Sequence, residues 1–162
     1  MTTQDDLIQV GAAKPADPQQ LLGLYQHMNS DDPLLPVDEA LAQHWRAILE
    51  NEALYYTVAR DGDRVVATCA LTIVPNLTRS ARPYGLIENV VTHPDYRKLG
   101  IGTRILHHAL DIAWSRSCYK VMLLTSRKDE AVFRFYENAG FARGVKTGFV
   151  AKNPVSADVA DG

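Results

Sequence analysis

The stretch from Leu86 to Leu106 constrains the fold more than any other part of the chain, because it dictates a strand, a turn, a glycine loop and a helix. Residues 86–92 are mostly apolar and include two β-branched valines, which predicts a largely buried strand. The sequence His-Pro-Asp at 93–95 then forces a turn, since proline has no amide hydrogen and disfavours helix in the residue before it. Apolar residues at helical spacing predict a helix after the loop: Ile101, Ile105, Leu106, Ala109, Ile112 and Ala113.

This predicted helix begins without a capping side chain. It follows the loop Arg97-Lys-Leu-Gly-Ile-Gly102, whereas Ser, Asp or Asn would normally accept hydrogen bonds from the first free amides. Free amides at the positive end of a helix, beside two cationic side chains and two glycines that let a ligand approach the backbone, suit a phosphate or pyrophosphate. The loop is therefore a predicted anion site.

The glycine spacing excludes two nucleotide-binding motifs. The dinucleotide fingerprint requires a third glycine three residues after Gly102, but that residue is Ile105. The mononucleotide P-loop requires Gly-Lys-Ser/Thr after a four-residue gap, and the sequence contains no such run. A glycine-containing turn without any ligand is the structural alternative, and the loop alone does not decide between the two interpretations.

Length and composition indicate an ordinary soluble globular protein. The 162 residues suffice for one core, and we expect one domain over residues 1–152 followed by a frayed polar tail at 153–162. Hydrophobic residues make up 46% of the chain and charged residues 22%, which excludes a disordered or fibrous protein. A formal net charge of −2 argues against a nucleic-acid partner.

Signals for targeting and for metal binding are not found. Residues 1–7 lack a basic segment followed by an apolar run, and no 18-residue apolar span occurs, so we expect a cytoplasmic protein without membrane contact. Cys69 and Cys118 are too few for a disulfide framework and too isolated for zinc, so we expect both to be reduced. The adjacent residues His107 and His108 point to different sides of a helix, so we expect no metal ligands there.

The order of the remaining predicted elements defines the fold class. Before the central stretch we expect a strand at 7–11, a helix opened by residues 15–18, a helix at 38–50, strands at 55–60 and 64–77, and a polar link at 78–84. After it we expect a strand at 119–125, a helix that starts with a capping box at 126–129 and ends at Gly140, and weak strands at 143–145 and 147–152. Hairpins combined with a strand-helix-strand crossover predict an α/β (α+β) fold with a mixed, mostly antiparallel sheet and helices on both faces.

Two motifs give the chain a family resemblance. The pattern Arg97-x-x-Gly100-x-Gly102 after a strand resembles the acetyl-CoA loop of the GNAT superfamily of N-acetyltransferases, which reads Gln/Arg-x-x-Gly-x-Gly/Ala. Residues 129–141 look like the family pattern Asn-x-x-Ala-x-x-Phe-Tyr-x-x-x-Gly-Phe, with Asp129 in place of the frequent Asn and Ala131 one place off. The resemblance covers residues 86–141, and the first half of the chain matches only in the order of its elements.

The resemblance implies acetyl-CoA as the cosubstrate and assigns its contacts. The pyrophosphate is expected at residues 98–103, and the pantetheine arm is expected to pair with the strand backbone as an added strand. Residues 126–128 are expected to form a solvated loop, with contact to the CoA phosphate on the adenosine as the alternative. The expected cofactor-binding residues are Val90, Val91, Thr92, Arg97, Lys98, Leu99, Gly100, Ile101, Gly102, Thr103 and Asp129.

Acetyl transfer to an amine requires a base and benefits from an acid. Only roughly one alkyl amine in a thousand is neutral at pH 7, so a base or a water relay must remove a proton. Glu88 is the one carboxylate inside the central strand, where partial burial would make it a better base; the alternative is a strand carboxylate that is held by hydrogen bonds or faces solvent. The resemblance assigns Tyr136 as the acid that protonates the departing thiolate, and a core tyrosine is the alternative.

Together these features predict an N-acetyltransferase that transfers an acetyl group from acetyl-CoA directly to a primary amine of a small molecule or peptide, within a ternary complex. Two alternatives stay open: a non-catalytic acyl-CoA-binding sensor or regulatory module, and an unrelated phosphate-binding domain. The acceptor is not predicted; Asp31 and Asp32 could meet a cationic acceptor, but helix-breaking turn chemistry explains them equally well. A homodimer is left open.

Overall fold

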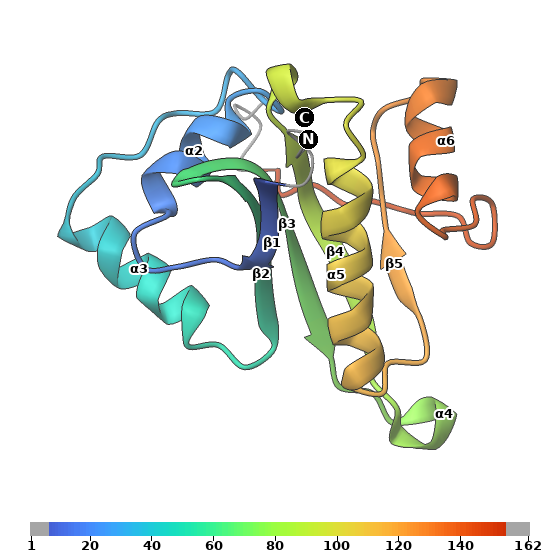
Figure 1. The fold of residues 1–162 in the computed structure, drawn as a ribbon. Coiled ribbons are helices and arrows are strands. Elements are labelled where there is room, and N and C mark those ends of the chain that lie inside the picture. Colours follow the sequence, from blue (N-terminus) through green and yellow to red (C-terminus); the bar gives the residue numbers. More distant parts are fainter. Residues whose placement is uncertain (1–6, 155–162) are drawn as a thin grey trace.

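A five-stranded sheet organises the computed structural model, which describes residues 7–154 (Figure 1). The strands lie side by side in chain order: β1 (Ile8–Ala12), β2 (Leu54–Asp61), β3 (Arg64–Val74), β4 (Tyr84–Thr92) and β5 (Val121–Leu123). Neighbours from β1 to β4 are antiparallel, whereas β5 is parallel to β4. The predicted mixed, mostly antiparallel sheet is therefore confirmed. Most of the tail expected to fray from residue 153 lies outside the described residues.

Helices cover both faces of the sheet, as predicted. They are α2 (Pro18–Tyr25), α3 (Glu39–Leu49), α4 (Thr78–Ala81), α5 (Ile101–Ser115) and α6 (Glu130–Asn138), with the 3₁₀ turn η1 (Pro94–Tyr96) before α5. One face is covered by α5, whose predicted stripe is buried except for the half-buried Ile112, and α6 lies beside it. The other face is covered by α2 and α3, which pack Leu21, Leu24 and Trp45 onto the sheet. Within residues 7–154, no helix combines the length and apolarity that crossing a membrane requires.

The helix ends separate correct from incorrect predictions. Asp38 caps α3, because its Oδ1 accepts a hydrogen bond from the Leu41 amide at 3.0 Å. The capping box predicted at 126–129 is wrong: α6 begins after Asp129, whose side chain caps nothing and instead accepts from Arg127 Nε at 3.2 Å. The predicted end of α6 is confirmed, since Gly140 has a φ of +101° and the Phe141 amide returns to the helix.

Several strand boundaries differ from the prediction. β3 ends at Val74 because Pro75 cannot donate to the ladder, and β5 covers 121–123 rather than 119–125. In place of a simple link at 78–84 the chain forms α4, in which residues 79–81 have left-handed φ angles near +60°. The weak strands expected at 143–145 and 147–152 are not formed; these residues are exposed and gain little from burial.

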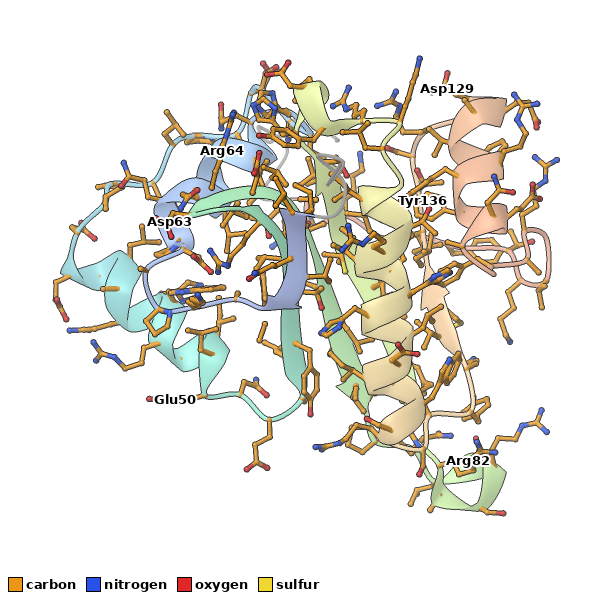
Figure 2. All side chains as sticks on the ribbon, in the orientation of Figure 1. Glu50, Asp63, Arg64, Arg82, Asp129 and Tyr136 are labelled. Carbon is orange, nitrogen blue, oxygen red and sulfur yellow. The ribbon has the colours of Figure 1, made fainter. Side chains whose placement is uncertain are left out.

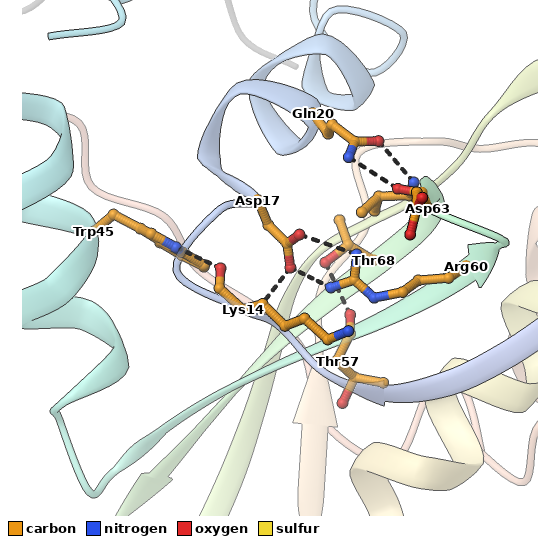
Figure 3. A network of polar contacts seen from close by, with 9 residues as sticks. Lys14, Asp17, Gln20, Trp45, Thr57, Arg60, Asp63 and Thr68 are labelled. Carbon is orange, nitrogen blue, oxygen red and sulfur yellow. Dashed lines mark hydrogen bonds and ion pairs between the residues drawn. The ribbon is translucent and has the colours of Figure 1, made fainter.

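A buried ion pair anchors the start of α2 to β2 (Figure 3). The carboxylate of Asp17, whose side chain is 3% exposed, accepts hydrogen bonds from the guanidinium of Arg60 and from the Lys14 amide. Trp45 of α3 donates its indole N–H to the Lys14 carbonyl at 3.0 Å, so the same loop also carries α3. This network holds α2 and α3 in place against the sheet, and so also holds both ends of the loop that joins them.

We expect Asp17→Asn to lower the free energy of unfolding by about 3 kcal/mol, because it leaves the Arg60 charge buried without its counter-ion. Urea denaturation followed by circular dichroism measures this loss. Asp38→Asn is the matched control, since asparagine caps a helix as well as aspartate and the side chain is exposed. Equal losses in the two variants would show that the buried pair has no special importance.

Candidate active site

A cleft opens where β4 separates from β5. The two strands pair only between Gly85–Ile87 and Val121–Leu123, although β4 continues to Thr92. Asn89 has a φ of 55°, and the register between β3 and β4 shifts beside it, so β4 bulges at this point. The backbone of residues 88–92 therefore borders open space on the side that faces α6.

This cleft has a volume of about 920 Å³ and brings together most of the predicted site. Its walls are β4, the loop before α5, the first turn of α5, the segment before α6, α6 itself and the loop after α2. The predicted residues that line it are Glu88, Val90, Val91, Thr92, Arg97, Lys98, Gly100, Ile101, Gly102, Thr103 and Tyr136.

Two predicted cofactor-binding residues do not line the cleft. Leu99 is 39% exposed and does not line the cleft, although its backbone is part of the glycine loop. Asp129 lies at the top of α6, above Tyr136, and its carboxylate faces Arg127 (Figure 2). Ser126 and Arg127, in the segment that the sequence assigned to a solvated loop, are exposed and also line the cleft. At this end the structure therefore offers a guanidinium rather than a carboxylate.

The glycine loop positions the uncapped end of α5. Gly100 is the N-cap residue, has a left-handed φ of +73° and offers no side chain to the first amides. Gly102 lies in the first turn, where an added Cβ would come within 2.9 Å of the Phe135 ring of α6. Arg97 holds the loop against β4 by donating from Nε to the Thr92 carbonyl at 3.2 Å. The helix N-terminus therefore opens into the cleft as an anion site.

Tyr136 reaches the cleft from α6. Its ring packs on Phe135 and Phe141, with centroid distances of 4.9 and 6.3 Å. Burial raises the pKa of the Tyr136 hydroxyl above its ordinary value, and the nearby Cys69 thiol and Glu88 carboxylate raise it further. The hydroxyl therefore stays protonated at neutral pH and can donate a hydrogen bond or a proton.

Glu88 lines the same cleft from the side opposite Tyr136. Its cross-strand neighbour is Ala70, which in turn pairs with Tyr56, and Tyr56 packs into the core beneath α2 and α3. Since cross-strand neighbours share a face, the Glu88 side chain points to the face of α2 and α3. The carboxylate is exposed, so the partial burial expected from the sequence is wrong. The phenol and the carboxylate thus flank the end of the cleft from opposite faces of the sheet.

The structure adds lining residues that sequence reasoning did not assign. Asn89 stands at the bulge, and Arg134 and Asn138 lie on α6 one turn apart. The loop after α2 adds His27, Met28, Asn29 and Asp32; only Asp32 had a sequence signal, as a carboxylate that could meet a cation. Within residues 7–154, no cluster of three or more His, Cys, Asp or Glu side chains is arranged to hold a metal.

These features define a class of protein. The cleft combines an edge of β4 that β5 leaves unpaired, a helix N-terminus without a capping side chain, and the Tyr136 hydroxyl and Glu88 carboxylate on its two sides. Such a site suits the transfer of a group from a phosphate-bearing cosubstrate. The chain belongs to the acetyltransferase (GNAT) family, whose model matches residues 21–141.

Individual relatives agree with this assignment. The chain is 41% identical over 78 residues to a glucosamine 6-phosphate N-acetyltransferase of Trypanosoma brucei brucei; the match covers 48% of this chain and about half (51%) of that protein. A solved putative acetyltransferase from Agrobacterium tumefaciens superposes with a TM-score of 0.84 at 47% identity, covering 90% of this chain and 99% of the other. A predicted acetyltransferase with acetyl-CoA from Clostridium acetobutylicum shares the fold, with a TM-score of 0.67, 23% identity, and coverage of 89% and 96%.

Proposed function

We propose that the protein is an acetyl-CoA-dependent N-acetyltransferase that acetylates a primary amine of a small molecule or peptide by direct attack in a ternary complex. The observation that carries this proposal is the presence of the open α5 N-terminus, Tyr136 and Glu88 in one cleft. Family membership supports the acetyltransferase activity, and the same fold is found with acetyl-CoA in the Clostridium acetobutylicum protein.

In this proposal the cosubstrate lies along the opened edge of β4. The amides of residues 100–103 bind the diphosphate, with Arg97 and Lys98 adding positive charge. The pantetheine arm pairs with the outer backbone of residues 90–92, which β5 leaves unpaired. Arg127, rather than Asp129, is the side chain available at the far end.

The proposed reaction proceeds in one displacement. The amine nitrogen attacks the thioester carbonyl carbon, a β4 amide at the bulge stabilises the oxyanion, and the carbon–sulfur bond then breaks. Glu88 takes the ammonium proton, directly or through water, and Tyr136 protonates the departing thiolate. The two roles require groups on opposite sides of the reacting carbon, which is the arrangement that the two faces of the sheet provide.

A panel of primary amines, assayed by release of the CoA thiol, tests the proposal. Thiol release that depends on both acetyl-CoA and an amine is the expected result. A protein that binds acetyl-CoA but turns over no amine would instead be the acyl-CoA sensor.

We expect Gly100→Val to weaken CoA binding at least tenfold, as measured by calorimetry. An added Cβ would meet no atom within 4 Å, so the effect comes from the φ of +73°, which a β-branched residue adopts only with strain that would turn the loop amides away. Gly62→Val is the matched control, because Gly62 also has a positive φ and open surroundings but lies outside the cleft. Unchanged CoA affinity in a folded Gly100→Val protein would remove the loop from the site.

A further inference from the structure

The loop between α2 and α3, residues 26–38, forms another wall of the cleft. It lines the cleft with His27, Met28, Asn29 and Asp32. Glu88 points to the same face of the sheet as this loop, whereas Tyr136 approaches from α6. If acetyl-CoA lies between β4 and α6, as in the proposed function, an acceptor on the α2 and α3 face would contact this wall.

Asp32 is held in a fixed position on this wall. Asn29 Nδ2 donates to Asp32 Oδ1 at 3.0 Å, and Gln26 Nε2 donates to the Asp32 backbone carbonyl at 3.1 Å. The side chain is half-buried, while the neighbouring Asp31 is exposed and does not line the cleft. A carboxylate that is ordered in advance binds a ligand cation at a lower entropic cost.

The segment that carries this wall contains no Lys or Arg. Between Lys14 and Arg46 the sequence contains neither Lys nor Arg, and its carboxylates are Asp17, Asp31, Asp32, Asp38 and Glu39. Of these, Asp17 is neutralised by Arg60, but among residues 7–154 no Lys or Arg forms an ion pair with Asp32. Among Lys, Arg, Asp and Glu, this wall therefore contributes only the Asp32 carboxylate to the cleft lining, next to the imidazole of His27.

The cations that line the cleft come from the cofactor side: Arg97, Lys98, Arg127 and Arg134. One basic cluster does approach the loop, because the rings of His27 and His93 lie 4.9 Å apart and Arg64 contacts His93 at 2.9 Å. However, burial and Arg64 lower the pKa of His93, so it is neutral at pH 7. Neither Arg64 nor His93 lines the cleft.

We propose that Asp32 binds a second positive charge on the acceptor, so that the substrates are diamines, polyamines or cationic peptides rather than phosphorylated amines. This inference rests on the proposed function. A phosphate placed at this wall would face Asp32 and Glu88, and like charges at a binding site exclude a ligand. The acceptor thus differs in charge from the substrate in the name of the Trypanosoma relative, which the chain matches over half its length.

Acceptors of matched length test the proposal by their kcat/KM at saturating acetyl-CoA. We expect 1,4-diaminobutane to exceed 1-aminobutane at least tenfold, and 4-aminobutyrate to be the poorest of the three. We also expect glucosamine to exceed glucosamine 6-phosphate. Asp32→Asn keeps the oxygen that accepts from Asn29 and should reduce the preference for diaminobutane about tenfold, mainly through KM.

Asp31→Asn is the matched control, because it removes the same charge one residue away from the cleft lining and should leave the preference unchanged. Asp32→Lys should reverse the preference in favour of 4-aminobutyrate. Equal effects of the two asparagine variants, or better turnover of glucosamine 6-phosphate than of glucosamine, would overturn the inference while leaving the proposed function intact. Absence of thiol release with every amine would refute the proposed function itself, and the inference with it.

Discussion

Tyr136→Phe is expected to lower kcat about a hundredfold while acetyl-CoA affinity stays near normal. The substitution removes only the hydroxyl, so the packing on Phe135 and Phe141 is kept. The loss follows from the departing thiolate, which would leave without a proton donor. Because burial raises the pKa of the hydroxyl above its ordinary value, Tyr136 remains a proton donor through the neutral and mildly alkaline range, and we expect its ionisation to cause no loss of the wild-type rate there.

Steady-state rates and calorimetry with acetyl-CoA together measure this effect. Tyr119→Phe removes the same atom beside β5 and outside the cleft, so its rates should equal those of the wild type. A Tyr136→Phe protein that turns over at the wild-type rate would make Tyr136 a packing residue and leave the thiolate to another acid, or to none.

Glu88→Gln is expected to lower kcat/KM by about ten- to a thousandfold, because the acceptor ammonium then has no side-chain base. It should also abolish or displace the acidic limb of the pH profile, which reports the base of the free enzyme. Raising the pH should partly restore the activity of the variant, since solution then supplies neutral amine. The exposed position of Glu88 allows water to take part in the transfer, which places the effect toward the lower part of this range.

The pH dependence of kcat/KM over the acidic range decides this prediction. Glu50→Gln is a suitable control, since Glu50 is exposed, follows α3 and lies away from the cleft (Figure 2). If Glu88→Gln keeps the wild-type profile at nearly full rate, the carboxylate is structural and the proton leaves through backbone and solvent alone.

The parts of the fold that could be predicted are those that depend on short-range chemistry. The buried stripe of α5, the turn at Pro94 and the left-handed Gly140 after α6 all follow from spacing or from the backbone preferences of single residues. Of the boundaries that were wrong, the end of β3 at Val74 also has a local cause, since Pro75 cannot donate to the ladder, whereas others do not follow from the local pattern. The start of α6 is an example, since a capping box at residue 126 fits the local pattern equally well, but the chain begins its helix three residues later.

The sequence by itself determined β4, the glycine loop and α5, and with them the family, because steric preferences and hydrophobic periodicity act over a few neighbouring residues. The position and the lining of the cleft were decided only by the tertiary structure. β5 pairs with β4 across about 35 residues of intervening chain and releases it after Ile87, which no local pattern encodes. Asp32, Glu88 and Tyr136 also come from three different elements and meet in one cavity. Side chains so far apart in the sequence come together only when other elements pack on both faces of the sheet.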